Sequence, residues 1–139
     1  MKKICIALIV AGFALSTVPP AYAIKQLKEA FEKQYVGEGA NADFKALADE
    51  AKCNICHVNK ESKKKVHNPY GTVVKEALEK AEFPIKEFKK EPEKYATQIE
   101  AIFQSVEGEK SGDAEGRTFV DRMKKANLLP GGNVDGKKE

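Results

Sequence analysis

Apolar residues recur at helical spacing along most of the chain and almost never alternate as they would in a β-strand. This pattern predicts an all-α domain of four to five helices. The expected segments cover residues 25–36, 41–51, 73–82, 92–107 and 114–127, with a short amphipathic piece at 85–90. Residues 58–69 show no apolar periodicity and are expected to form a loop, and the polar tail up to residue 139 is expected to be frayed.

The first 23 residues have the pattern of a secretory signal peptide. Lys2 and Lys3 precede an apolar run over residues 4–15, and Ala21-Tyr22-Ala23 is a small-residue cleavage site. The run is too short to span a bilayer, so no membrane anchor is expected after cleavage. The mature chain, residues 24–139, would be one domain of 116 residues in the periplasm or another extracytoplasmic compartment.

The most specific motif is Cys53-Asn54-Ile55-Cys56-His57, a C-x-x-C-H sequence. This is the attachment signature of a c-type haem, in which each thiol forms a thioether with a haem vinyl group. The adjacent histidine then binds the iron as the proximal ligand. The motif therefore predicts one covalent haem c, bound through Cys53 and Cys56, with His57 on the iron.

Two other chemistries use a similar cysteine pair. A redox dithiol of the thioredoxin kind occurs in a βαβ context, which this helical pattern lacks. A zinc site needs four ligands; only Cys53, Cys56, His57 and His67 are on offer, and adjacent residues 56 and 57 suit one tetrahedron poorly. Both remain as alternatives to haem.

Three possibilities remain open for the opposite, distal face of the iron. His67 is favoured: an extended chain of ten residues reaches about 33 Å, enough to pass a haem edge. The turn-forming sequence Asn68-Pro69-Tyr70-Gly71 directly after it would fix the imidazole. Met123 is the alternative ligand, although its spacing from Phe119 and Val120 also suits plain core packing. The third possibility is an open or water-bound iron.

These segments together resemble small secreted monohaem cytochromes c of anammox and related planctomycete bacteria. The stretches that carry the resemblance are 53–57, the lysine-rich loop, 67–71, 121–125 and 129–131. The resemblance implies a class I cytochrome c-like fold around the haem and adds Tyr70 to the residues expected at the cofactor. Some proteins of this group are similar to a heterodimeric cytochrome with His/Cys ligation. This chain has histidine at position 67 and no third cysteine in the mature part, so thiolate ligation is not carried over.

The remaining composition favours an electron carrier over an enzyme. Apart from the haem ligands, no nucleophile with a partner base and no phosphate-binding glycine loop is present. Removal of the signal leaves 22 basic and 21 acidic side chains, which gives no sign of nucleic-acid binding. An acidic redox partner is expected to dock near Lys60, Lys63, Lys64 and Lys65. A homodimer or a heterodimer with another cytochrome stays open, as does the alternative function of binding NO or CO or of serving as a haem subunit in a larger complex.

Overall fold

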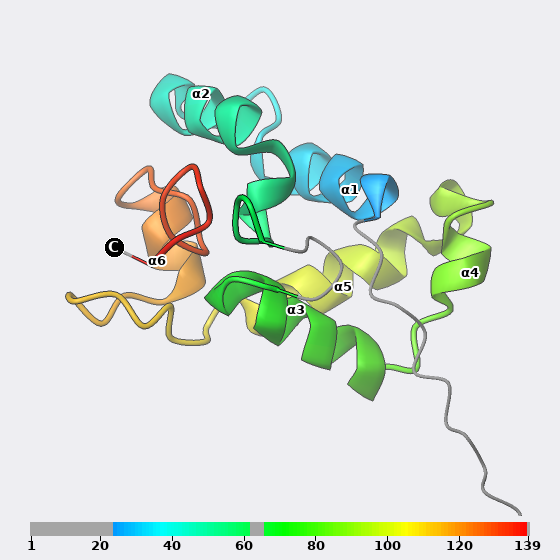
Figure 1. Ribbon diagram of the computed structural model, residues 1–139. Helices are drawn as coiled ribbons and strands as arrows, with labels where there is room; N and C mark the ends of the chain where they lie inside the picture. The colour runs from blue at the N-terminus through cyan, green and yellow to red at the C-terminus, as the bar shows by residue number, and fades with distance from the viewer. Residues whose placement is uncertain (1–23, 62–65, 139) are drawn as a thin grey trace, which may run out of the picture.

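The computed structural model describes residues 24–61 and 66–138, and this part of the chain is all-α, as predicted (Figure 1). Its helices are α1 (Lys25–Tyr35), α2 (Ala42–Ala51), α3 (Pro69–Lys80), α4 (Ile85–Phe88), α5 (Ala96–Val106) and α6 (Phe119–Lys124), with 3-10 turns η1 (Lys52–Ile55) and η2 (Pro92–Tyr95). Among the described residues extended pairing is limited to two isolated bridges, His57 with His67 and Lys110 with Thr118. The expected signal peptide, residues 1–23, lies outside them.

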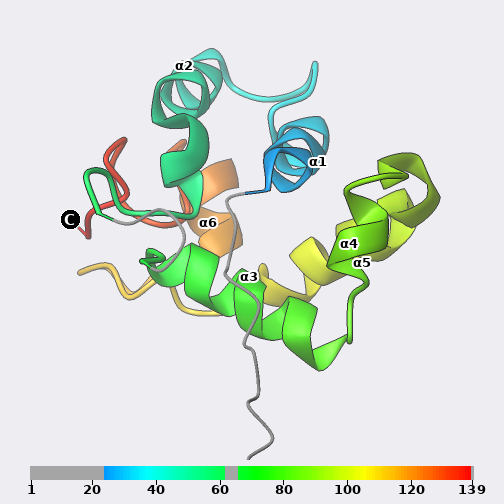
Figure 2. The same ribbon diagram turned by 45° about the vertical axis from the view of Figure 1, so that its right-hand side comes forward.

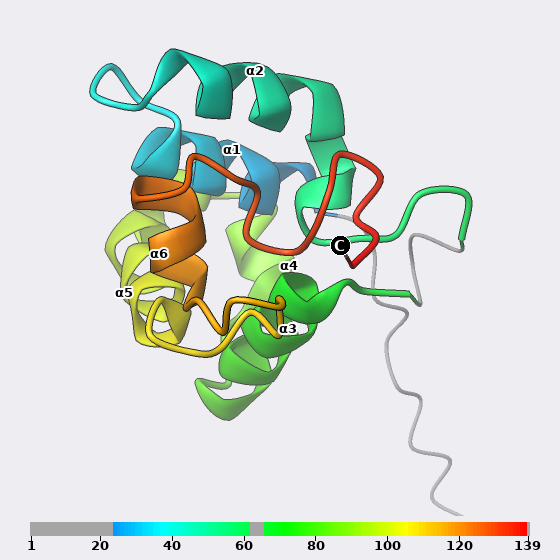
Figure 3. The ribbon, with the colours of Figure 1, turned by 90° about the vertical axis from the view of Figure 1, so that its left-hand side faces the viewer.

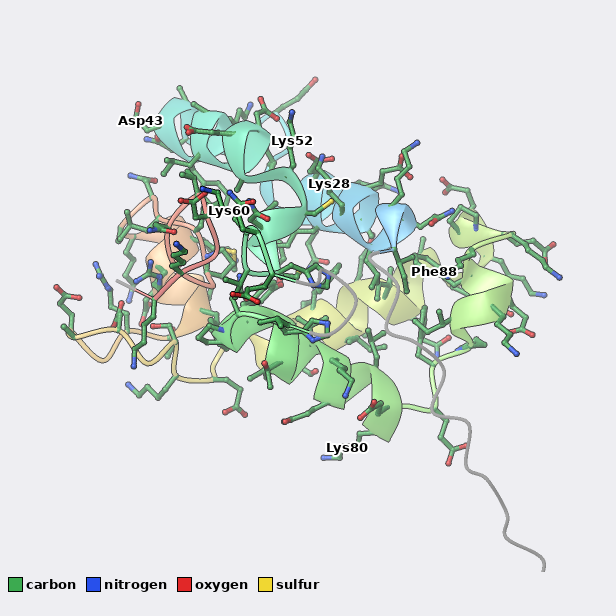
Figure 4. All side chains as sticks on the ribbon, viewed as in Figure 1. Lys28, Asp43, Lys52, Lys60, Lys80 and Phe88 are labelled. Carbon is green, nitrogen blue, oxygen red and sulfur yellow. The ribbon has the colours of Figure 1, made fainter. Side chains whose placement is uncertain are left out.

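Helix α5 is the centre of the packing, because both α1 and α3 pack against it (Figure 2). Its buried positions Ile99, Ile102, Phe103 and Val106 follow the predicted helical spacing. Gln26 Nε2 of α1 donates a 3.1 Å hydrogen bond to the carbonyl of Lys89, the residue that follows α4. The buried Phe88 lies on the side of α4 that faces α1 (Figure 4). Within the described residues, no helix has the length and apolar content needed to cross a membrane.

The first two helices lie close to their predicted positions. Helix α1 buries Phe31 and Tyr35, and α2 buries Phe44, Ala48 and Ala51. Asn41 caps α2, since its side chain accepts a hydrogen bond from the Asp43 backbone N–H. Helix α2 runs directly into η1, so the Cys53–His57 segment follows immediately after a helix.

The prediction for the third helix was wrong at its start. Helix α3 begins at Pro69, four residues before the expected position, and ends at Lys80. The Asn68-Pro69-Tyr70-Gly71 sequence forms a helix start instead of a turn: the Asn68 side chain accepts from the Gly71 N–H, and Pro69 occupies the first helical position. His67 therefore precedes a capped helix.

The last predicted helix, 114–127, was also wrong in extent. Helix α6 spans only Phe119–Lys124, and Thr118 caps it by accepting from the Asp121 N–H. The preceding residues form a loop in which Asp113 Oδ1 accepts from the Arg117 N–H and Gly116 has φ 65°. These local bonds satisfy the backbone in a conformation that competes with a helix.

The C-terminal tail is folded, contrary to the expectation of a frayed end. From residue 129 to residue 136 most positions are buried or half-buried, and the segment runs from α6 back across the end of η1 (Figure 3). It thus packs on the segment that carries the two cysteines, although some 80 residues separate them along the chain, as in the pair Asn54 and Val134.

Candidate functional site

Cys53, Cys56 and His57 lie together on one tight turn. The backbone N–H groups of Cys56 and His57 both donate to the Cys53 carbonyl, over 3.3 and 3.1 Å. Lys52, with φ 52°, ends α2 and turns the chain into η1. Both thiols are free and half-buried. Burial raises the pKa of the Cys56 thiol to about 12, and the nearby Cys53 raises it further, so this thiol is protonated at neutral pH.

The imidazole of His57 is buried and oriented by the backbone opposite. Its exposed fraction is 7 %. Its Nδ1 lies 3.3 Å from the Val66 carbonyl oxygen. The tautomer with a proton on Nδ1 donates to that carbonyl and leaves Nε2 as the electron-pair donor.

His67 lies directly beside His57. The two residues form an isolated antiparallel bridge, and their ring centroids are 4.7 Å apart with an interplanar angle of 33°. The flanking hydrogen bonds run from Val58 N–H to Val66 O (3.4 Å) and from Asn68 N–H to Cys56 O (3.0 Å). This pattern makes residues 57 and 67 a non-hydrogen-bonded pair, the type in which facing side chains are closest. Burial lowers the pKa of His67, and the electrostatic interactions with His57 and Lys75 lower it further.

The Asn68 side chain binds the turn that carries Cys53, Cys56 and His57. It is 2 % exposed, and its side-chain Nδ2 donates to the carbonyls of Asn54 and Ile55, both at 2.9 Å. Its Oδ1 accepts from the Gly71 N–H at the start of α3. One side chain thus joins the helix start after His67 to the two residues between the cysteines.

Two features of the first turn of α3 bring it against Cys56. Gly71 packs on the Cys56 backbone so closely that a Cβ atom at residue 71 would overlap the Cys56 carbonyl. Tyr70 is fully buried, and its hydroxyl has no hydrogen-bond partner among the described residues. Burial raises the pKa of Tyr70 well above 10, and the proximity of Cys56 raises it further.

The C-terminal segment covers the same turn, a contact that the sequence analysis missed. Asn54 Nδ2 donates to the Val134 carbonyl (3.1 Å), while Asn59 binds Asp135 through its backbone N–H and through Nδ2, both at 2.7 Å. Gly136 lies on the His57 carbonyl. The one sequence feature that could have indicated this contact is Gly136, because glycine suits a left-handed φ, here 69°.

A buried charge network holds this segment in place. Arg122 is 2 % exposed, and it donates from Nε to the Leu129 carbonyl (2.8 Å) and from Nη1 to Asp113 Oδ2 (3.0 Å). Arg117 Nε donates to the same Asp113 oxygen over 2.6 Å. The network therefore links α6, the 113–117 loop and the start of the C-terminal segment.

The other predicted site residues lie apart from this turn or outside the described residues. Met123 is 3 % exposed and belongs to the hydrophobic core, on α6. Lys60 is exposed on the loop after η1 (Figure 4). The other lysines of the predicted docking patch, Lys63, Lys64 and Lys65, lie outside the described residues. Lys60 is the member of the patch whose position the structure describes.

A zinc site receives no support from the arrangement of side chains. Across residues 24–61 and 66–138, no group of three or more His, Cys, Asp or Glu residues is placed to hold a metal ion. Comparison with known proteins adds no assignment: no family model, no curated protein and no solved structure matches the chain.

Proposed function

We propose that the chain is a monohaem c-type cytochrome that carries single electrons. Cys53 and Cys56 would each add a thiol S–H across a haem vinyl group to form a thioether, and His57 would bind the iron. The observation that carries this proposal is that a single turn presents both free thiols together with an imidazole whose Nδ1 faces a carbonyl. The haem would supply a one-electron couple; the protein supplies attachment, orientation and shielding.

The hydrogen bond of His57 supports a ligand role. Metal-binding histidines commonly donate their second ring N–H to a backbone carbonyl, which fixes the tautomer and the ring plane. The Val66 carbonyl, 3.3 Å from Nδ1, is placed for this. In that tautomer Nε2 carries the lone pair and would bind the iron.

The unpartnered hydroxyl of Tyr70 also fits a prosthetic group. A buried hydroxyl without a partner costs about 1–3 kcal/mol. Tyr70 is fully buried and packs beside Cys56. A haem attached at Cys56 would offer this hydroxyl a weak O–H···π contact, without supplying a base that could take its proton.

The spacing of His57 and His67 sets one condition on the proposed His/His ligation. Two imidazoles on opposite sides of one iron need ring centroids about 6 Å apart, from two metal–nitrogen bonds of about 2 Å and the inner half of each ring. The observed 4.7 Å between near-parallel rings is shorter. His67 can therefore serve as the distal ligand only after the 57–67 bridge opens, and the 3.4 Å Val58–Val66 bond that borders the bridge lies beyond the usual range for such bonds.

The fold and location follow from the same proposal. We infer a class I cytochrome c-like arrangement, with α1, α3 and α5 packed together beside the attachment turn, in an extracytoplasmic compartment where haem is attached. Lys60 would be part of a surface that steers an acidic redox protein toward the haem.

The position of His67 favours a second candidate function. If His67 stays paired beside His57 after haem attachment, it cannot reach the opposite face of the iron. Met123, the other predicted ligand, is packed in the core. An iron with an open distal face would suit NO or CO binding, or a haem subunit of a larger complex.

One set of measurements tests the first function and separates it from the second. The chain is produced with its N-terminal segment in a host that attaches haem c. Intact mass and the pyridine haemochrome spectrum should show one covalent haem, and Cys53→Ala with Cys56→Ala should abolish it. A low-spin EPR spectrum of the oxidised protein is expected for an electron carrier. A high-spin spectrum that changes on addition of NO would favour gas binding, and a chain without covalent haem would refute both.

A further inference from the structure

Aromatic rings connect the attachment turn with the far side of α1. Phe31 contacts Tyr70 at a centroid distance of 5.8 Å and Tyr35 at 5.0 Å. Phe103 of α5 contacts both Phe31 and Tyr35 at 6.2 Å. The series Tyr70, Phe31, Tyr35 therefore has no saturated side chain interposed between neighbouring rings.

The inner end of this series lies at the proposed haem. Tyr70 is on the first turn of α3, and the next residue, Gly71, packs on the Cys56 backbone. The Tyr70 hydroxyl has no hydrogen-bond partner among the described residues. A proton lost from Tyr70 would have no acceptor there.

The outer end has such an acceptor. The Tyr35 hydroxyl donates to Glu107 Oε1 over 2.9 Å and accepts from Gln34 Nε2 over 3.1 Å. Tyr35 is 8 % exposed, and the Glu107 side chain is 23 % exposed with Lys124 Nζ at 3.9 Å. Helix α1 and the residue after α5 thus hold a phenol and a carboxylate in direct contact at the edge of the core.

This contact decides which tyrosine can be oxidised. Removal of one electron makes a phenol strongly acidic, so its oxidation is favourable only where the hydroxyl proton has a base within hydrogen-bond reach. Of the tyrosines in the described part of the chain, Tyr35 has a carboxylate partner, while Tyr70 has none and Tyr95 contacts Phe83 and Lys94. An electron hole that enters the ring series should therefore localise on Tyr35.

We propose that Tyr35 is a redox-active residue, connected to the haem through Phe31 and Tyr70, with Glu107 as its proton acceptor. The inference rests on the proposed haem. In the oxidation of Tyr35, one electron leaves its ring toward the haem and its hydroxyl proton moves to Glu107, which leaves a neutral phenoxyl radical and a neutral carboxylic acid. With a hydroperoxide as oxidant, the ferrous iron and Tyr35 each supply one electron; hydrogen peroxide with two solvent protons becomes two water molecules.

The experiment treats the ferrous holoprotein with one equivalent of hydrogen peroxide and freezes it for EPR. A tyrosyl radical is expected, and ring-deuterated tyrosine should narrow its hyperfine pattern. Tyr35→Phe should abolish the signal. Glu107→Gln keeps the Tyr35 ring but removes its proton acceptor, so it should lower the yield of the tyrosyl radical at least tenfold. Tyr95→Phe is the matched control and should leave the signal unchanged.

Further variants test the route and the dependence on haem. Tyr70→Phe keeps the ring and removes only its hydroxyl, so the radical yield should not change, because Tyr70 has no proton acceptor among the residues that the structure describes and is not itself oxidised. Phe31→Leu removes the ring between Tyr70 and Tyr35 and should lower the radical yield several-fold. A radical that survives in Tyr35→Phe, or that is equally strong in Glu107→Gln or Phe31→Leu, would overturn the inference while the covalent haem stands. The absence of covalent haem in the pyridine spectrum would overturn the proposed function as well.

Discussion

Gly136 lies against the backbone carbonyl of His57, so closely that a Cβ atom at residue 136 would overlap the His57 oxygen and approach the Asn54 oxygen. Its φ of 69° is in the left-handed region. Both features favour glycine, the residue that allows the C-terminal segment to close over the turn with the two cysteines. The proposed haem site therefore depends on residues from both halves of the chain.

Substitution of Gly136 should open this contact. In Gly136→Ala, the left-handed φ costs about 1–2 kcal/mol, and the overlap with the His57 carbonyl adds to it, for a total of about 3 kcal/mol or more of unfolding free energy. Urea denaturation followed by circular dichroism measures the loss. Gly116→Ala is the matched control, since Gly116 has φ 65° but no atom within 4 Å of an added Cβ. Equal losses in the two variants would mean that the close contact contributes nothing.

A carboxylate in place of the Asn68 amide should destabilise the fold. Asn68→Asp keeps the oxygen that caps α3 but replaces the amide donor with an oxygen that faces the Asn54 and Ile55 carbonyls. A buried charge without a partner costs about 3 kcal/mol or more, so the midpoint of urea unfolding should fall markedly at neutral pH. The control is Asn41→Asp, the same change at the exposed cap of α2, expected within about 0.5 kcal/mol of wild type. A similar effect at both caps would refute the role of the Asn68 amide.

Local patterns in the sequence were sufficient for much of the helical core. The apolar spacing located α1 and the buried face of α5, and the Asn41 cap marked the start of α2. The boundaries of α3 were missed because Asn68-Pro69 suits both a turn and a capped helix start. The short α6 was missed because the Asp113–Arg117 bonds that replace its expected first turns are not visible in apolar periodicity.

The site was predictable only in part for a related reason. The Cys53–His57 motif is contiguous, so the prediction of haem attachment needs the sequence alone. The bonds from Asn54 to Val134 and from Asn59 to Asp135 join residues 80 and 76 positions apart, and no local pattern indicates such pairs. His67 was predicted as a ligand on the face of the iron opposite His57, whereas its observed placement beside His57 depends on the pairing of two short segments.

The buried network around Asp113 should make stability depend on pH in acid. Burial alone would raise the pKa of Asp113, but hydrogen bonds from Arg117 and Arg122 outweigh this and hold it well below 3.8. A carboxylate with a depressed pKa stabilises the fold above its ordinary pKa, and this contribution disappears as pH falls through the depressed value. Urea midpoints of the wild type should therefore decline from about pH 4 toward pH 2.

Asp113→Asn is the variant that checks this assignment. It should lower the midpoint at neutral pH, because the buried Arg122 loses its ion pair with Asp113, and it should flatten the decline in acid. Glu115→Gln removes the exposed carboxylate that also binds Arg117 and should change neither feature appreciably. An acid decline as steep in Asp113→Asn as in the wild type would place the responsible carboxylate elsewhere.

The distal ligand can be assigned with a pair of variants. If the 57–67 bridge opens and His67 binds the iron, His67→Ala should convert the oxidised holoprotein from low spin to high spin in EPR and near-infrared spectra. Met123 is buried in the core, so Met123→Leu, which nearly conserves its volume, should leave the low-spin spectrum intact and cost less than about 1.5 kcal/mol. The reverse pattern would make Met123 the ligand. A spectrum that is high spin in the wild type and unaltered by either change would show that His67 keeps its place beside His57 and that the distal face is open.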